Sequence, residues 1–151
     1  MNGNDNYSTG YEYKSRGERT IATFLDSVKL KYNYEPGVLV NDNGYKRIWY
    51  PDFGLPKYDV FIEYFGMEND PVYDERTRHK LKTFRNNDID VISVYPSTLR
   101  GDYKEYILNE LHQNVSGRMS DLEQTIANYS SHRNPPPMLK FPKYGFCSSK
   151  Y

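Results

Sequence analysis

Residues 49–66 read WYPDFGLPKYDVFIEYFG and carry the strongest structural signal in the chain. Two runs rich in aromatic and β-branched residues flank a turn that contains Gly54 and Pro56, a pattern typical of a β-hairpin. Asp52 ends the first run and Glu63 lies in the second, so such a hairpin brings them side by side although they are 11 residues apart. Carboxylates on adjacent strands offer the hard oxygen ligands that Mg²⁺ or Mn²⁺ prefers. The segment therefore predicts a divalent-metal site on a hairpin.

The sequence before this hairpin predicts a helix and further strands. Ser15 can cap the N-terminus of the helix, and Glu18 follows three residues later, as in a capping box. Apolar residues then recur at helical spacing and give the helix one apolar face: Ile21, Phe24, Leu25 and Val28. Strands are expected at residues 32–40 and 45–53, and the turn between them, residues 41–44, ends in an Asn-Gly pair that suits a tight hairpin.

A third strand is expected at residues 57–65, and beyond it the pattern alternates between helix and strand. Asp70 and Pro71 open a helix that extends to about residue 86. The remaining expected elements are a strand at residues 89–95, a turn at 97–101 and a helix at 102–112. The predicted order is α-β-β-β-α-β-α. Because parallel strands need a crossover connection, we expect an α/β fold with a mixed sheet flanked by helices.

The chain of 151 residues is long enough for one domain with a single core. We divide it into a flexible N-terminal segment (residues 1–14), a core domain (15–113) and a C-terminal extension (114–151). The last 28 residues contain no Asp or Glu, and their basic residues include Arg133, Lys140 and Lys143. We expect these residues to form an extended arm, whose cations and aromatic rings can contact DNA phosphates and bases or pack on a partner subunit, or else a disordered tail.

Composition limits the possible classes of function. With 20 basic and 20 acidic residues the formal net charge is zero, so any binding to nucleic acid must be local. A single cysteine, Cys147, allows no intrachain disulfide and fits a reducing, intracellular setting. The three histidines are too scattered to predict a zinc site: His79, His112 and His132. Because we find no Gly-rich phosphate loop, no apolar run of 18 residues and no signal-peptide pattern, we expect no nucleotide hydrolysis, membrane span or secretion.

Three pieces of the sequence resemble the PD-(D/E)XK nuclease superfamily, which has the restriction-endonuclease-like fold. They are Glu18 on the first helix, Asp52 in its Pro-Asp pair, and Glu63 in the run Glu-Tyr-Phe. The resemblance covers roughly residues 15–111 and agrees with the predicted order of elements. It implies that Asp52 and Glu63 bind Mg²⁺ or Mn²⁺, that a backbone carbonyl near Tyr64 adds a ligand, and that Glu18 holds a second metal or a metal-bound water.

The chain departs from the family pattern at one position. The family lysine would fall at position 65, which is Phe65 in this chain. One branch of the superfamily has an acid-X-Phe-Gly pattern and supplies the lysine from the following helix. On the expected helix, Lys80 shares a face with Arg76, whereas Lys82 lies roughly 200° from Lys80 around the axis. The resemblance therefore implies that Lys80 is the catalytic lysine, with Arg76 as the reserve cation.

Together these features predict a Mg²⁺-dependent endonuclease that hydrolyses DNA phosphodiester bonds and works inside a cell, in the cytoplasm or nucleoid, or in a host cell if the chain is viral. A homodimer is expected because two-fold symmetry suits duplex DNA. Its role would be junction resolution, processing of mobile-element or viral DNA, or repair. Two alternatives remain: a non-catalytic DNA-binding module in which Phe65 marks the decay of the site, and a nuclease that acts on RNA.

Overall fold

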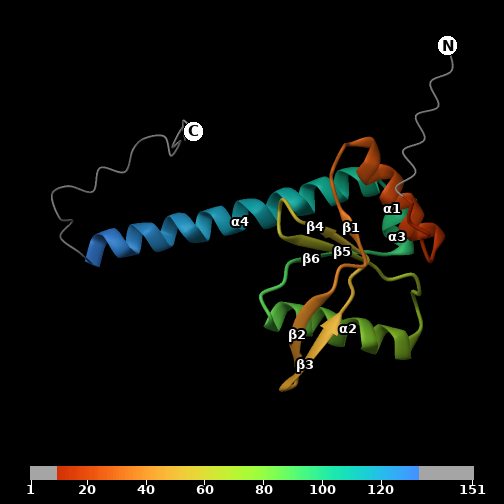
Figure 1. Ribbon diagram of the computed structural model, residues 1–151, viewed down its shortest axis with the longest axis horizontal. Helices are drawn as coiled ribbons and strands as arrows, with labels where there is room; N and C mark the ends of the chain where they lie inside the picture. The colour runs from red at the N-terminus through yellow and green to blue at the C-terminus, as the bar shows by residue number, and fades with distance from the viewer. Residues whose placement is uncertain (1–9, 133–151) are drawn as a thin grey trace, which may run out of the picture. The chain divides into compact units, whose positions relative to one another are not determined.

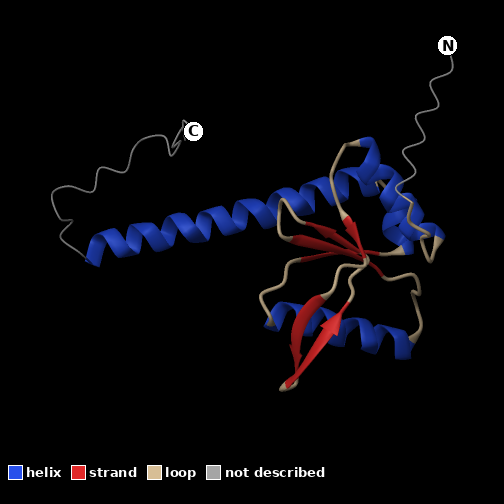
Figure 2. Ribbon diagram, viewed as in Figure 1, coloured by secondary structure: helices blue, strands red, loops and turns tan. Residues whose placement is uncertain are grey.

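The computed structural model describes residues 10–132, and these residues form a mixed α/β fold (Figures 1 and 2). The helices are α1 (Arg16–Ser27), α2 (Pro71–Asn86), α3 (Pro96–Arg100) and α4 (Tyr103–His132). The strands are β1 (Asn33–Tyr34), β2 (Val38–Asp42), β3 (Tyr45–Trp49), β4 (Phe53–Leu55), β5 (Val60–Tyr64) and β6 (Val91–Val94). One compact unit ends at Val115, and residues 116–132 of α4 belong to a second unit. No helix among the described residues is long and apolar enough to cross a membrane.

The main sheet has four strands in the order β1-β4-β5-β6. The pairs β1–β4 and β4–β5 are antiparallel, whereas β5 and β6 are parallel and are connected through α2. Strands β2 and β3 form a separate antiparallel ribbon. The expected mixed sheet flanked by helices is therefore confirmed. Helix α2 provides the crossover connection that the parallel strands β5 and β6 require.

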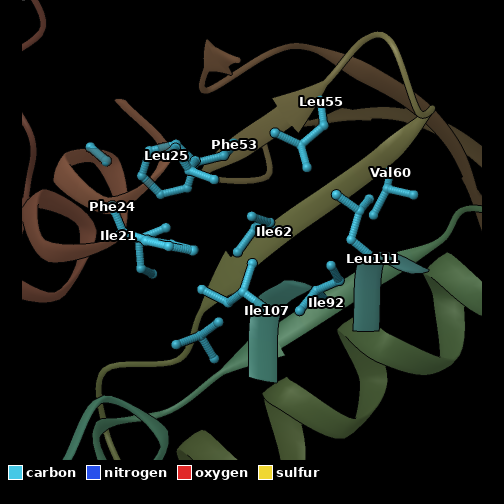
Figure 3. Close-up of a cluster of buried hydrophobic side chains, with 12 residues drawn as sticks. Ile21, Phe24, Leu25, Phe53, Leu55, Val60, Ile62, Ile92, Ile107 and Leu111 are labelled. Atoms are coloured by element: carbon cyan, nitrogen blue, oxygen red, sulfur yellow. The ribbon is translucent and has the colours of Figure 1, made fainter. Parts of the chain in front are cut away.

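The two faces of the main sheet carry different side chains. On one face, residues of α1, β4, β5, β6 and the start of α4 form the hydrophobic core (Figure 3). Ile62 of β5 and Ile92 of β6 are fully buried there. Side chains alternate along a strand, so Glu63, next to Ile62, lies on the opposite face, toward α2. This alternation separates the apolar core from the polar residues considered below.

Two of the expected strands are broken in the structure. The strand expected at residues 32–40 is interrupted at residues 35–37, and the strand expected at 45–53 is interrupted at residues 50–52. Pro36 and Pro51 lie at these breaks, and proline has no N–H for a ladder hydrogen bond. Glu35 also has a φ of 48°, which directs the chain out of the sheet. The breaks separate the β2–β3 ribbon from the main sheet.

The expected helix starts and the hairpin turn are confirmed. The side chain of Ser15 caps α1 by accepting from the N–H of Glu18, and Asp70 caps α2 by accepting from two N–H groups. Asn43 and Gly44 have φ values of 53° and 89°, as a tight turn of the Asn-Gly type requires. Val28 is the exception on the expected apolar face of α1, because it ends the helix and is 40% exposed.

The C-terminal part of the chain differs from expectation. The turn expected at residues 97–101 is the short helix α3, and the helix expected at 102–112 extends to His132. Residues 124–132, assigned to an extended arm, are therefore helical; they contain no proline, and the proline run begins only at Pro135. The rest of the predicted arm, with Arg133, Lys140 and Lys143, lies outside the described residues.

Candidate functional site

Asp52 and Glu63 meet at the end of the β4–β5 hairpin. The register pairs Phe53 with Ile62, so Asp52 lies one residue beyond that pair and opposite Glu63. The N–H of Tyr64 donates to Asp52 Oδ2 at 2.7 Å and fixes the carboxylate against β5. Helix α1 packs closely on the Tyr64 ring, since a Cβ at Gly17 would lie 2.2 Å from its Cζ. Backbone pairing and this close packing therefore hold Asp52 beside Glu63.

Lys80 of α2 reaches the same place. Its ammonium donates to Glu63 Oε1 and forms an ion pair with it. Glu63 is 6% exposed, and its second oxygen, Oε2, is buried without a hydrogen-bond donor among the described residues. A buried carboxylate oxygen without a partner is costly, and a bound cation would relieve that cost. The structure thus brings together three of the predicted site residues: Asp52, Glu63 and Lys80.

Burial is the main reason that both carboxyl groups are hard to ionise. Desolvation, followed by the charges of Glu63 and Glu18, raises the pKa of Asp52 to about 7, although the Tyr64 N–H and Lys80 oppose the shift. Desolvation also raises the pKa of Glu63, against the lowering effect of Lys80. A divalent cation between the two groups would favour their charged forms. The pair therefore has the chemistry of a cation site, and perturbed acids of this kind are typical of functional sites.

Glu18 is held by its own set of donors. Its carboxylate accepts from the Ser15 hydroxyl at 2.8 Å, from the N–H of Lys14 at 3.1 Å and from the Tyr34 hydroxyl. Its charge still reaches the other acids, because it contributes to the raised pKa of Asp52 and of Glu63. In the described part of the chain, no three Asp, Glu, His or Cys residues are close enough to hold one metal ion together. A metal here would therefore rest on Asp52 and Glu63, with the role of Glu18 still a prediction.

A cleft of about 680 Å³ opens beside Lys80. Its lining comes from α2, from β3 and the residue after it, from the segment before α1 and from the link between β1 and β2: Lys14, Glu35, Ile48, Trp49, Tyr50, Val72, Glu75, Arg76, His79 and Lys80. Tyr50 is 58% exposed and directly precedes Pro51 and Asp52. Arg76, the predicted reserve cation, lines the cleft and is exposed, but it does not contact the carboxylates. The cleft thus combines exposed rings with cations, and Lys80 connects it to the acidic pair, although Asp52 and Glu63 are not among its lining residues.

The β2–β3 ribbon forms one wall of this cleft because it is docked on α2. Asn41 and Asn87 exchange two hydrogen bonds, at 2.7 and 3.0 Å, between residues 46 positions apart. His79 Nε2 lies 3.0 Å from Asp42 Oδ1, and a ring contact completes the interface. That contact places Trp49 edge-on to Phe84, with ring centroids 5.4 Å apart. The wall is therefore built from contacts that are remote in sequence.

Sequence reasoning missed the cleft-lining aromatic residues. The signal for Tyr50 was its position directly before the Pro-Asp pair, whereas nothing local indicated that Trp49 and His79 would meet. Phe65, at the position of the family lysine, is buried and stacks on Tyr95, with ring centroids 5.5 Å apart. Comparison with family models, curated proteins and solved structures finds no match to this chain.

Proposed function

We propose that this protein is a metal-dependent endodeoxyribonuclease whose core has the restriction-endonuclease-like arrangement. The observation that carries the proposal is the pairing of Lys80 with Glu63 beside Asp52. In the proposal, Lys80 on α2 takes the place of the lysine that the family carries on the strand, and its contact with Glu63 supports this role. The mixed sheet, with its antiparallel hairpin followed by a crossover helix and a parallel strand, supports the same assignment.

Each side chain has a distinct part in the proposed reaction. Asp52 and Glu63 would hold Mg²⁺ or Mn²⁺, and Glu63 Oε2, which has no hydrogen-bond partner within residues 10–132, supports this assignment. When bound, the metal lowers the pKa of a water and neutralises charge that develops on the phosphate. Lys80, paired with Glu63 Oε1, would orient the attacking water or stabilise the phosphate charge. Glu18 adds negative potential at the site and, in the proposal, binds a water or a second metal.

The cleft supports DNA as the substrate. Since the chain has no net charge, attraction to phosphates must come from local cations, and Arg76 and Lys80 supply them at the cleft. The exposed ring of Tyr50, two residues before Asp52, offers a surface on which a base can stack. In this arrangement the backbone of one strand would cross the carboxylates. We propose that two copies act together inside a cell, one for each strand of a duplex.

A second candidate is a DNA-binding module without catalysis. It is favoured by one observation, the buried phenylalanine at position 65, where the family has its lysine. In that case the Lys80–Glu63 ion pair would serve only to hold α2 on β5. The two candidates differ in whether the site binds a metal and cuts DNA, which a cleavage assay detects.

The proposal is tested by cleavage of supercoiled plasmid with Mg²⁺ or Mn²⁺, comparing the wild type with Asp52→Ala and with an EDTA control. Nicked or linear products that need the metal and disappear in Asp52→Ala support the nuclease. Intact plasmid, with DNA binding retained by both proteins, contradicts it and leaves the binding module. The same assay with a structured RNA decides whether RNA is the substrate instead.

A further inference from the structure

The second unit of the chain carries a line of exposed apolar side chains on one helix. Met119, Leu122, Ile126 and Tyr129 lie on α4, and each is more than half exposed, between 53% and 59%. They are separated by three, four and three residues, which is the spacing of the a and d positions in a coiled coil. Single exposed apolar residues are common, but a regular line of four indicates a surface that another helix covers.

The residue types at these positions select a particular kind of partner. With Met119 and Ile126 at a, Leu122 and Tyr129 occupy d. A β-branched residue at a with leucine at d favours two parallel strands, and this combination occurs in the central layers, Leu122 and Ile126. The positions away from the seam are mostly polar: Ser120, Asp121, Gln124 and Asn128. The helix therefore has one apolar seam and a solvated outer surface.

The flanking charges identify the partner as a second copy of the same helix. Arg118 precedes Met119 and occupies a g position, and Glu123 follows Leu122 and occupies an e position. In a parallel pair, a g residue faces the e residue five positions later in the other chain, so Arg118 of each copy faces Glu123 of the other. An antiparallel pair brings together like positions, g with g and e with e, and forms no such match.

We propose that residues 116–132 of α4 form a parallel two-stranded coiled coil with a second copy of this chain. The four apolar residues would form the buried layers, and two Arg118–Glu123 pairs would fix the direction and register. This association involves none of the residues of the acidic site, so it can be tested without measuring DNA cleavage. The apolar residues of α4 would be the surface through which the two proposed copies associate.

Sedimentation equilibrium of the full chain, without DNA or metal, tests the surface. The wild type is expected to form a dimer at micromolar concentrations, and Leu122→Glu is expected to be monomeric because it places a charge in the seam. Gln124→Glu is the matched control: it adds the same charge two residues away on the outer surface and is expected to leave the dimer intact. A monomeric wild type, or a dimer that survives Leu122→Glu, overturns the proposal.

A charge exchange tests direction and register. Arg118→Glu alone creates two Glu–Glu contacts, and Glu123→Arg alone creates two Arg–Arg contacts, so each variant is expected to dissociate more readily than the wild type. An equimolar mixture of the two variants restores both opposite-charge pairs and is expected to give a 1:1 heterodimer. If the mixture associates no better than either variant alone, the parallel arrangement is wrong. Since DNA cleavage is not measured, this result stands apart from the nuclease proposal.

Discussion

Lys80 of α2 pairs with Glu63 of β5 across 17 residues of sequence, and it does so beside a second carboxylate, Asp52. The contact is possible because β5 alternates, directing Ile62 into the core and Glu63 toward α2. Helix α2 thus supplies a cation beside two acids whose pKa values burial raises. This relationship is the basis of the predictions that follow.

Replacing Lys80 with methionine is expected to reduce the rate of DNA cleavage by roughly 100-fold or more, the usual contribution of a positioned acid–base group. DNA binding, measured by fluorescence anisotropy with Ca²⁺ in place of Mg²⁺, should change little. Lys82→Met is the matched control, because Lys82 is an exposed lysine on the same helix and does not line the cleft. Equal activity in Lys80→Met and Lys82→Met would remove Lys80 from the reaction.

Asp52→Asn is expected to stabilise the metal-free protein at alkaline pH. Because the pKa of Asp52 rises from 3.8 to about 7 on folding, the native state holds this proton where the unfolded chain has lost it. The free energy of unfolding of the wild type therefore falls between about pH 4 and pH 7, by an amount on the order of 2–4 kcal/mol. Urea denaturation should give Asp52→Asn a larger free energy of unfolding than the wild type at pH 8, and no such advantage at pH 4. If the two proteins differ in free energy of unfolding by the same amount at both pH values, the Asp52 carboxylate is not a buried charge that destabilises the fold.

Mn²⁺ is expected to raise the melting temperature of the wild type at pH 8. A ligand that binds only the native state stabilises it by about 2.7 kcal/mol at 100 times its dissociation constant. Asp52→Asn, which keeps an oxygen that can accept from the Tyr64 N–H but removes the charge, should lose most of this shift. Differential scanning fluorimetry over a range of Mn²⁺ concentrations measures both. The same shift in both proteins would place metal binding elsewhere in the chain.

Tyr50→Ala is expected to weaken DNA binding by about 1–3 kcal/mol, the usual effect of removing one ring that stacks on a base. Tyr45→Ala provides the comparison, since Tyr45, at the start of β3, is also an exposed tyrosine but does not line the cleft. Anisotropy titrations of both variants against a labelled oligonucleotide measure the difference. If the two substitutions have equal effects, the cleft is not where the DNA lies.

Glu18→Gln separates a structural role of this acid from a catalytic one. Ser15→Ala removes the hydroxyl that caps α1 and contacts Glu18, at a cost of about 1 kcal/mol, without touching the Glu18 charge. If Glu18 takes part in the reaction, Glu18→Gln loses cleavage whereas Ser15→Ala keeps it at a similar stability. Thermal denaturation and a single-turnover cleavage assay on both variants measure the two effects. Similar activity in both variants would confine Glu18 to capping the helix.

The parts of the fold that are specified locally could be predicted from the sequence. The cap of α1 at Ser15, the start of α2 at Asp70 and the Asn43-Gly44 turn all depend on residues within a few positions of each other. The hairpin that aligns Asp52 with Glu63 is also specified by residues close together in the sequence.

The cleft could not be predicted, because its wall depends on contacts between residues far apart in the chain. The pairing of Asn41 with Asn87 joins residues 46 positions apart, and neither residue signals it. The length of helix α4 could not be predicted for another reason. Its second half is largely polar, so it has no continuous apolar face that would indicate a helix. The seam from Met119 to Tyr129 becomes visible only as a spacing of three and four residues.

The most direct test of the central claim is single-turnover cleavage of end-labelled DNAs by the wild type and Asp52→Ala, with Mg²⁺ or Mn²⁺. The substrates are a plain duplex, a four-way junction, a flap and a single strand of related sequence. We expect cutting of at least one substrate that depends on the metal and is lost in Asp52→Ala, and the substrate that is cut names the specificity. No cutting of any DNA by a folded wild type that still binds it would contradict the nuclease.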